Sequence, residues 1–447
     1  MTARTLAVRL EQFDEPVGLL SSTSEGGTSY SYTEQYLGRP DKVPVSLALP
    51  LRPEQFGDPE TRAFFDNLLP ENDQLKQVME REGLARTDVV GLLFHLGADC
   101  PGAISCVPSG QYPIKIPGVI STDYDLLQDE DVKDIVRRLA DQEPLPSEIR
   151  DPSPLAGVQR KIAVAQLQDG RFGLPKSGLR VPTTHILKVP RRNKGREAQL
   201  EAAAALLGQA AALEVAIPTV LDIDGLPALL VPRFDRTVGS DGTVRRIHQE
   251  DFAQALGLPA ALKYQRYGKE GRRFDVANIV RLLDLTAEPA VSRREFLTTT
   301  FFNIVVGNND NHAKNHALLY DKGAAPRLAP LYDILPIQLD YAVTQDFSFR
   351  IGNAERFSSL TGRDITAFFA DFGLSTAAAA RFVSDTIVPM LKQIDQVSGD
   401  LSAQGLKDFD DLIGREVRKL AELLGVNVSI RNRDYYSPSA GGWRLSS

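Results

Sequence analysis

Within the first 110 or so residues, one segment alternates apolar and polar positions in the way that a strand requires. Segment 43–51 places an apolar side chain at every second position, which predicts a half-buried strand. Pro44 and Pro50 would put this strand at a sheet edge, because proline cannot donate a ladder hydrogen bond. The alternating apolar residues of segment 43–51 are Val43, Val45, Leu47, Leu49 and Leu51. Helical patterns follow over residues 62–69 and 73–82. We therefore expect a small β-rich unit at the N-terminus.

The middle of the chain mixes short apolar runs with one helical pattern. Strand-like runs occupy residues 161–167, 185–189 and 226–232. The alanine and leucine content of residues 196–213 predicts a helix. The stretch 111–117 is expected to be a linker, and the proline-rich stretch 142–155 a surface loop.

From about residue 248 onward, the patterns are mostly helical. Ser292 and Glu295 have the spacing of a capping box, which predicts a helix that begins there and ends near Gly307. The chain after Ile430 has no periodicity and is expected to be loosely held. The order is a β-rich unit, a strand-and-helix lobe and a helical lobe, which is an α+β arrangement suited to a nucleotide between two lobes. The predicted boundaries are 1–112, 113–247 and 248–430, with a flexible tail over 431–447.

Composition narrows the class of protein. The chain has 447 residues, 43% of them hydrophobic and 24% charged, which suits two or three packed units of a soluble globular protein. No signal peptide and no run of about 18 apolar residues is visible. Two cysteines are too few for a disulfide scaffold or a structural zinc site, so we expect a cytoplasmic protein. A net charge of −7 argues against a protein that mainly coats nucleic acid.

One short segment concentrates polar chemistry. Residues 306–320 read VGNNDNHAKNHALLY and place a carboxylate, two imidazoles, an ammonium and four amides between two apolar runs. Asp310 and Asn315 are five residues apart, which is the separation of the base and the metal-binding asparagine in a protein-kinase catalytic loop. Asp333 supplies a second carboxylate after the strand-like stretch 317–320, as a magnesium site for phosphoryl transfer needs.

Two further charged residues extend this hypothesis. Lys188 ends a strand-like run, where its ammonium group could reach nucleotide phosphates, and Glu201 on the following helix could orient it. The chain has neither G-x-x-x-x-G-K-[ST] nor G-x-G-x-x-G, so a phosphate-gripping loop at residues 156–161 is one interpretation among others. Lys188 and Glu201 could equally be ordinary surface residues.

Together these segments resemble the HipA-type serine/threonine kinase toxins of type II toxin–antitoxin systems. The resemblance runs in order from Phe65 to Asp333. It rests on the segments FDNLLPE, GADCPGAISCVP, AGVQRK, PTTHILKVP, RFDR, HQEDFAQALGLP, GNNDNHAKN and LAPLYDI. The implied fold is bilobal and protein-kinase-like (HipA-like), with an N-terminal β-rich subdomain and a mostly helical C-terminal lobe.

The resemblance implies an ATP- and Mg²⁺-dependent kinase. Asp310 would be the catalytic base, and Asn315 and Asp333 the magnesium ligands. Tyr332 precedes the metal-binding aspartate, where a structural role is favoured. Residues of the nucleotide site would be Ala156, Gly157, Val158, Gln159, Arg160, Lys161, Lys188, Pro232, Arg233, Phe234, His312, Lys314, Asn315, Tyr332 and Asp333.

The resemblance also implies partners and a point of departure. The expected substrate is a protein, usually an aminoacyl-tRNA synthetase, and the expected partner is a small helix-turn-helix antitoxin of HipB type that brings the complex to DNA. No membrane association is expected. The family's regulatory serine would fall at Pro154 here, so Ser153 becomes the candidate for autophosphorylation.

Two other functions fit parts of the pattern. A metal-dependent hydrolase could use Asp310, His312, His316 and Asp333 as ligands, since imidazoles and carboxylates bind transition metals. A catalytically inactive binding module could keep the kinase-like shell. Metal dependence without ATP would indicate the first, and absence of phosphate transfer the second.

Overall fold

The chain folds into two compact units, and each unit is built from separate segments of the sequence. We describe it from a computed structural model, which covers residues 4–433 apart from 24–25, 71–72, 111–113, 147–148, 150–159, 322 and 324. One unit, here unit 1, comprises residues 1–198, 218–262 and 317–329. The other, unit 2, comprises residues 199–217, 263–316 and 330–447. The domain boundaries expected from the sequence stay predictions.

Unit 1 begins with an antiparallel sheet in the order β3-β2-β1-β4. Its strands are β1 (Thr5–Leu10), β2 (Gly18–Ser22), β3 (Thr28–Tyr32) and β4 (Ile104–Pro108). The helices of this region are α1 (Glu34–Leu37), α2 (Asp58–Phe65), α3 (Asp73–Glu82) and α4 (Val89–Leu96). Buried aliphatic and aromatic side chains form its core, in which the Tyr30 ring contacts both Phe56 and Phe65. The helix predicted at 73–82 is confirmed.

The strand predicted over residues 43–51 is wrong. The segment is irregular and makes only one bridge, between Ser46 and Leu49. Side chains bind its backbone in place of a neighbouring strand: the Tyr32 hydroxyl donates to Leu49 O at 2.5 Å, and Leu47 N donates to Glu250 Oε1 at 2.9 Å. The alternating apolar residues are still largely buried, so the pattern reported burial correctly but not backbone conformation.

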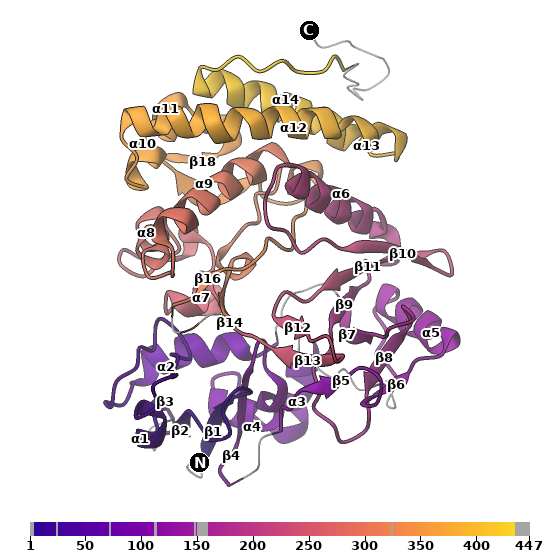
Figure 1. Ribbon diagram of the computed structural model, residues 1–447, viewed down its shortest axis with the longest axis vertical. Helices are drawn as coiled ribbons and strands as arrows, with labels where there is room; N and C mark the ends of the chain where they lie inside the picture. Colours follow the sequence, from indigo (N-terminus) through magenta and orange to yellow (C-terminus); the bar gives the residue numbers. More distant parts are fainter. Residues whose placement is uncertain are drawn as a thin grey trace. The chain divides into compact units, whose positions relative to one another are not determined.

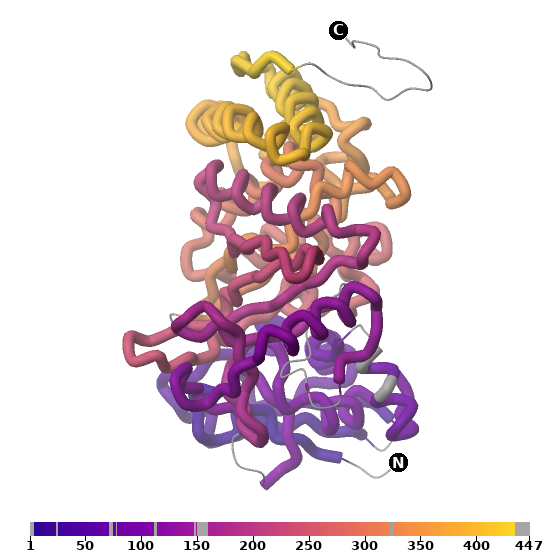
Figure 2. The backbone as a smooth tube through the Cα atoms, turned by 90° about the vertical axis from the view of Figure 1, so that its right-hand side faces the viewer, coloured from indigo at the N-terminus to yellow at the C-terminus, as the bar shows by residue number. Residues whose placement is uncertain are grey.

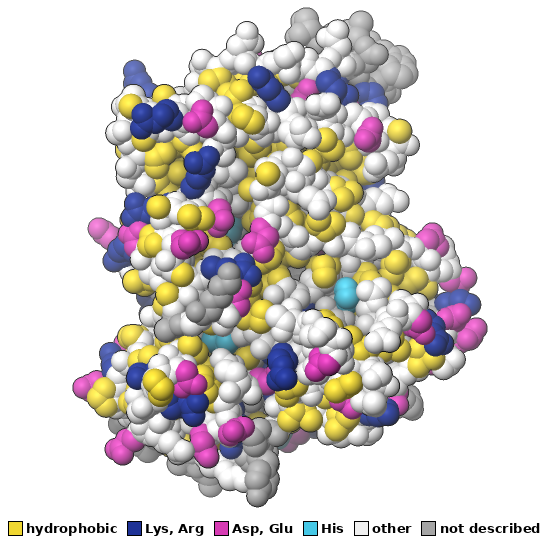
Figure 3. Space-filling view, in the orientation of Figure 1, with side chains coloured by type: hydrophobic (Ala, Val, Ile, Leu, Met, Phe, Trp, Pro, Cys, Tyr) yellow, Lys and Arg dark blue, Asp and Glu magenta, His cyan; other side chains and the backbone are white. Residues whose placement is uncertain are grey.

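The second sheet of unit 1 has the order β10-β11-β9-β7-β8-β6. Its strands are β6 (Tyr124–Leu126), β7 (Lys161–Gln166), β8 (Phe172–Pro175), β9 (His185–Lys188), β10 (Thr219–Ile223) and β11 (Leu226–Pro232). Helix α5 (Asp129–Ala140) buries Ile135, Val136 and Leu139 against one face of this sheet (Figure 1). The opposite side of helix α5 is charged. Figure 3 shows positively and negatively charged side chains interspersed over this helix.

Two three-stranded sheets complete unit 1. Strands β12 (Arg236–Val238), β13 (Thr243–Arg246) and β5 (Gly118–Val119) form one of them, and β14 (His248–Asp251), β15 (Ala317–Tyr320) and β16 (Arg327–Leu328) form the other. Helix α7 (Phe252–Ala255) follows β14. The strands predicted over 226–232 and 317–320 are confirmed.

The expected linker at 111–117 is anchored where the structure describes it. Lys115 is 3% exposed, and its Nζ donates to Cys100 O at 2.7 Å and pairs with Asp99 at 3.3 Å. Burial lowers the pKa of Lys115 to about 8, with Asp99 opposing the shift. The buried Lys115 side chain therefore anchors this segment to the interior of unit 1, while Ile116 beside it is exposed.

Unit 2 is mostly helical. Its helices are most of α6 (Arg196–Ala210), with α8 (Val276–Leu283), α9 (Pro289–Val305), α10 (Gly362–Asp371), α11 (Thr376–Phe382), α12 (Val388–Val397), α13 (Gly399–Ala403) and α14 (Lys407–Leu424). A hairpin of β17 (Asp346–Ile351) and β18 (Ala354–Arg356) joins them. Figures 1 and 2 show α12 and α14 side by side. Phenylalanine rings at 296, 349, 368 and 372 pack together in the core.

Helix α9 begins one turn before the predicted capping box. Pro289 occupies its first turn, which proline favours because its fixed φ suits a helix start and its missing N–H costs nothing there. Ser292 lies inside the helix and accepts a hydrogen bond from the Thr286 hydroxyl at 2.9 Å. The predicted end near Gly307 is confirmed, since α9 ends at Val305.

The chain just after Ile430 is not loosely held. Arg431 N donates to Asp395 Oδ2 at 2.7 Å, and the Arg433 guanidinium, whose side chain is 2% exposed, pairs with Asp395 and Asp410. Two buried carboxylates therefore hold residues 431–433 against α12 and α14. Residues 434–447 lie outside the described part of the chain.

Candidate active site

Residues 307–316 carry the expected catalytic residues and are called here the catalytic segment. The segment starts from a glycine that no other residue could replace without strain. Gly307 has φ 70°, the left-handed region that glycine tolerates best. A Cβ atom there would lie 2.7 Å from Leu412 Cδ2. Gly307 therefore ends α9 and turns the chain sharply into the polar segment.

The amides at the start of the segment are structural. Asn308 Nδ2 donates to Asn303 Oδ1 at 3.0 Å, and Asn309 Nδ2 donates to Gln345 O at 3.1 Å. The Ser348 hydroxyl donates to Asn309 O at 2.9 Å. Much of the polar chemistry in this segment thus holds the loop in one shape, since buried polar groups need partners.

Asp310 is half-buried beside a tyrosine. The Tyr264 hydroxyl donates to Asp310 Oδ1 at 2.6 Å. Burial raises the pKa of Asp310, and the nearby Asp333 adds to the rise. The Tyr264 hydrogen bond and the charges of Lys263 and Arg266 oppose it. A carboxylate whose pKa is raised is a stronger base than an exposed one.

The Asn315 side chain folds back onto Asp310. Its Nδ2 donates to Asp310 O at 2.7 Å, while its backbone N donates to His312 O at 2.8 Å. The Asn315 Oδ1 has no hydrogen-bond partner among the described residues. An amide oxygen held in this way is a ligand type that Mg²⁺ accepts.

The two histidines of the segment are neutral. Burial lowers the pKa of His312 to about 3 and that of His316 to about 4. The His312 ring meets the Tyr264 ring edge to face at 5.0 Å. His316 Nε2 lies 3.2 Å from Asn311 O, and its ring packs against Phe296. His316 is therefore a core residue.

The metal-hydrolase interpretation lacks its ligand set. Among the residues that the structure describes, no three His, Cys, Asp or Glu side chains come together as a group that could hold a metal ion. His316 in particular faces the phenylalanine core of unit 2.

Asp333 has a strained backbone. Its φ is 58°, which is rare for any residue other than glycine and, at functional sites, is often maintained by the surrounding structure. The preceding residues fix it: Leu331 N donates to Glu214 O at 2.8 Å, and the Tyr332 hydroxyl donates to Lys314 O at 2.8 Å. The carboxylate of Asp333 is exposed and close enough to Asp310 to influence its pKa.

In unit 1, two lysines share one face of the six-stranded sheet. Lys161 on β7 lies directly opposite Lys188 on β9, and opposed residues of antiparallel strands point to the same side. Their neighbours Ile162 and Leu187 point to the other side, into the core cluster that contains α5. Lys188 is 8% exposed. The face that α5 leaves uncovered thus carries two ammonium groups side by side.

The RFDR segment makes more contacts than the sequence indicated. Arg233 N donates to Thr184 O at 3.0 Å, and Pro232 is paired with His185 across β11 and β9. The Arg233 side chain pairs with Asp235 at 3.0 Å and is 3% exposed. The family resemblance implies that residues 232–234 line the adenine side of the nucleotide as a hinge. Only their backbone fits this role, since the Arg233 guanidinium is bound inside unit 1.

Asp235 is the centre of a buried ionic cluster. Asp235 accepts from Arg233, from Arg236 and from Gly102 N at 3.1 Å. Arg246 continues the cluster by pairing with Glu11 at 2.5 Å and Asp99 at 3.3 Å. We define the ionic cluster as Glu11, Asp99, Lys115, Arg233, Asp235, Arg236 and Arg246. It joins the first sheet region of unit 1 to the strands around the hinge.

Several predicted residues are not brought together by the described structure. Ser153, Ala156, Gly157, Val158 and Gln159 lie outside the described residues. Arg160 is described, and its guanidinium donates to Gln142 O at 3.3 Å. Lys188 belongs to unit 1 and Glu201 to unit 2, so their pairing stays a prediction.

Sequence reasoning missed the residues that flank Asp310 from 263 to 266. Lys263 O accepts from Ala313 N at 3.0 Å, and Arg266 lies over the Tyr264 ring at 4.1 Å. The available signal was the alternation of cations and aromatics in Lys-Tyr-Gln-Arg-Tyr at 263–267, which lies far from Asp310 in the sequence.

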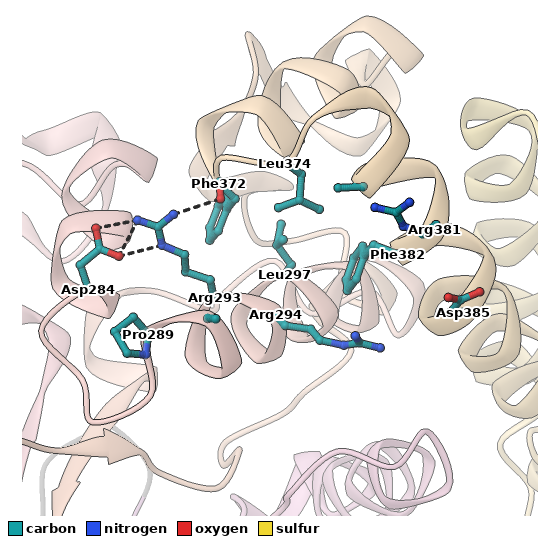
Figure 4. Close-up of a pocket in the computed structure, with 12 residues that line it drawn as sticks. Asp284, Pro289, Arg293, Arg294, Leu297, Phe372, Leu374, Arg381, Phe382 and Asp385 are labelled. Carbon is teal, nitrogen blue, oxygen red and sulfur yellow. Dashed lines mark hydrogen bonds and ion pairs between the residues drawn. The ribbon is translucent and has the colours of Figure 1, made fainter.

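A separate cavity of about 630 Å³ lies on unit 2 away from these residues. Figure 4 shows Leu297, Leu374 and Phe382 gathered around it. Arg293 closes one end by pairing with Asp284 and donating to Phe372 O at 3.2 Å. None of the residues expected to act in phosphate transfer lines this cavity.

Comparison with known proteins identifies the family. Residues 6–107 match the HipA N-terminal domain model, and residues 153–396 match the HipA-like C-terminal domain model. The curated protein "Putative kinase Y4mE" of Sinorhizobium fredii is 32% identical over 90% of this chain and 94% of its own length. The serine/threonine-protein kinase toxin HipA of Shewanella oneidensis is 28% identical over 83% of this chain and 85% of its own length.

A solved structure has the same fold. It is that of HipA with HipB and operator DNA from Shewanella oneidensis, with a TM-score of 0.76, 23% identity and coverage of 94% of this chain and 98% of that one. The fold class expected from the sequence is confirmed. No helix in the described part of the chain is long and apolar enough to cross a membrane.

The fold places the chain in the class of bilobal, kinase-like α+β proteins. Family models cover more than half of its length. The chain belongs to the HipA family of kinase toxins.

Proposed function

We propose that this protein is an ATP- and Mg²⁺-dependent serine/threonine protein kinase and the toxin of a toxin–antitoxin pair. The observation that carries the proposal is the arrangement around Asp310. Asp310 and Asp333 lie close enough to interact electrostatically, and Asn315 is hydrogen-bonded to Asp310 within the same unit. A base with two oxygen ligands beside it is what phosphoryl transfer to a hydroxyl requires.

Asp310 acts as the base. Its Oδ1 accepts from Tyr264, and its Oδ2 has no hydrogen-bond partner among the described residues. A serine or threonine hydroxyl bound at Oδ2 would be oriented for attack. It would lose its proton to the carboxylate as its oxygen bonds to the γ-phosphorus and the bond from that phosphorus to ADP breaks.

The remaining residues fit a nucleotide with its metal ion. Asn315 Oδ1 and the Asp333 carboxylate are hard oxygen ligands, and Mg²⁺ would supply charge neutralisation between phosphates when bound. Lys161 and Lys188 present two ammonium groups on one sheet face, as contact with phosphate oxygens requires. The backbone of residues 232–234 would receive the base of the nucleotide, as the family resemblance implies.

The biological role follows from family membership. We propose that the target is a protein of translation, in the first place an aminoacyl-tRNA synthetase. The related Shewanella HipA was solved with HipB and operator DNA, so a HipB-type antitoxin is the proposed partner here. A chain with a net charge of −7 should need a basic partner to hold DNA.

Labelled ATP tests the enzyme activity and its substrate together. The purified chain, incubated with Mg²⁺, labelled ATP and a bacterial lysate, should transfer phosphate to one or a few proteins on serine or threonine. Asp310→Asn keeps the shape of the side chain but is not a base, so transfer should fall by about 10²–10⁴-fold.

Asp385→Asn is the matched control. Asp385 is exposed on unit 2, and the same substitution there removes an equal charge. Its transfer activity should equal that of the wild type. Equal transfer by the Asp310 variant, or no transfer by any variant, would refute the proposed function and leave the inactive binding module as the better interpretation.

A further inference from the structure

Tyr264 makes a contact with Asp310 that no role described so far explains. The phenol oxygen lies 2.6 Å from Asp310 Oδ1, within the range of a strong O–H···O⁻ hydrogen bond. The ring is half-buried between the edge-to-face contact with His312 at 5.0 Å and the Arg266 guanidinium at 4.1 Å. These ring contacts restrict the side chain, so the hydroxyl has a defined position.

Each of the two residues next to Tyr264 is hydrogen-bonded to another segment of unit 2. On one side, Lys263 O accepts from Ala313 N at 3.0 Å, inside the catalytic segment. On the other side, Gln265 Oε1 accepts from Arg350 N at 2.7 Å, on strand β17. A tyrosine held at both neighbouring residues can transmit its position to the carboxylate.

An aspartate side chain has two oxygens and a soft terminal torsion. The torsion about the carboxylate is broad, so a half-exposed aspartate samples several orientations unless a partner fixes it. Tyr264 occupies Oδ1 and leaves Oδ2 for an acceptor hydroxyl. Catalytic groups need to be held within about 0.5 Å and 10–20° of the productive geometry.

We propose that Tyr264 is a positioning residue for phosphate transfer, which fixes the Asp310 carboxylate through Oδ1 so that Oδ2 faces the acceptor hydroxyl. This inference rests on the proposed function, because it assigns Tyr264 a role through the base. Lys263 and Arg266 on the same segment, with Asp333 across the site, are the other charged groups that face Asp310.

The same contact has an opposite interpretation. The Tyr264 hydroxyl could stand where the substrate hydroxyl binds and so block the enzyme. The free Oδ2 and the fixed ring favour positioning over blocking. The two interpretations predict changes of opposite sign when the hydroxyl is removed, so one variant separates them.

The experiment is Tyr264→Phe in the full-length chain. The substitution keeps the ring and its contacts and removes only the hydroxyl. The kcat for transfer from labelled ATP to the lysate protein should fall about tenfold, with KM for ATP and the thermal midpoint unchanged. Replacement of Tyr264 by 3-fluorotyrosine, which keeps the hydroxyl as a donor, should restore the rate.

Combining the variant with Asp310→Asn tests whether Tyr264 acts through the base. Residual transfer in the Asp310→Asn protein should not fall further when Tyr264→Phe is added. Tyr267→Phe is the control, since Tyr267 is 58% exposed on the same segment and no hydrogen bond joins its hydroxyl to Asp310. It should leave kcat unchanged.

Each other outcome overturns the inference in a recognisable way. An unchanged kcat in Tyr264→Phe refutes positioning, and a raised kcat indicates blocking. An equal fall with and without Asp310 indicates a merely structural role. If Asp310→Asn itself retains full transfer, the proposed base is wrong, and this failure is visible before Tyr264 is changed.

Discussion

The ionic cluster of unit 1 and the catalytic segment of unit 2 differ in how many partners they give to a carboxylate. In the cluster, Asp235 is 3% exposed, and its carboxylate pairs with two guanidinium groups and accepts from a backbone N–H. In the catalytic segment, Asp310 is partly exposed and accepts one side-chain hydrogen bond, from Tyr264. Both are aspartates at the end of a stretch of apolar chain, so the difference lies in their partners.

The pKa shifts follow from this difference. Burial by itself would raise the pKa of Asp235, but the charges of Arg233 and Arg236 outweigh burial and lower the pKa. At Asp310, burial outweighs the opposing partners and raises the pKa. A saturated carboxylate stabilises the fold, whereas an incompletely satisfied one remains available for chemistry.

The sharpest way to break this comparison is the same substitution in both places. Asp235→Asn should destabilise unit 1 by about 3–5 kcal/mol, because it leaves four buried cations with two carboxylates. Asp310→Asn should leave the free energy of unfolding unchanged or slightly raised, since it removes a desolvated charge. Chemical denaturation of both variants measures this, and equal losses would show that the comparison is mistaken.

The next prediction concerns Mg²⁺·ATP binding by variants of Asp333. Asp333→Asn should weaken Mg²⁺·ATP binding about tenfold or more, because the anionic ligand is lost while asparagine still tolerates φ 58°. Asp333→Ala should lose the same affinity and also about 1 kcal/mol of stability, because alanine is strained there. Titration calorimetry and thermal unfolding separate the two effects. Unchanged affinity in both variants would remove Asp333 from the site.

The smallest expected effect concerns Glu250, whose carboxyl group is buried without a cation beside it. Burial raises the pKa of Glu250 to about 7, with hydrogen bonds from Ser46, Tyr320 and Leu47 N opposing the shift. A raised pKa in the folded state means that the folded protein binds the proton more tightly than the unfolded chain. The free energy of unfolding of the protein should therefore fall as pH rises from about 4.5 to 7.

Glu250→Gln replaces the titrating carboxyl group with a neutral amide. The difference in unfolding free energy between the variant and the wild type should change by roughly 1–2 kcal/mol across that pH window, in favour of the variant at the upper end. The buried histidines titrate alike in both proteins and cancel in the difference. A pH-independent difference would mean that Glu250 is ionised throughout.

The sequence by itself determined the local elements and the central chemistry. Strands at 226–232 and 317–320 and the helix at 73–82 follow from apolar periodicity, which is set by neighbours along the chain. The five-residue spacing of Asp310 and Asn315 also needs no tertiary information. The hydrogen bond between Asn315 Nδ2 and Asp310 O at 2.7 Å is contained within that loop.

Only the tertiary structure decided which residues complete these features. Tyr264 reaches Asp310 across 46 positions of the sequence, and Glu250 holds Leu47 across 203. Arg433 looked like part of a loose tail because its partners, Asp395 and Asp410, lie on other elements. Periodicity reports which side of an element is buried, but the partner of a polar group depends on which distant segments fold against it. For this protein, the spacing in the sequence pointed to Asp310 as the proposed base, whereas only the folded structure showed the hydrogen bond from Tyr264.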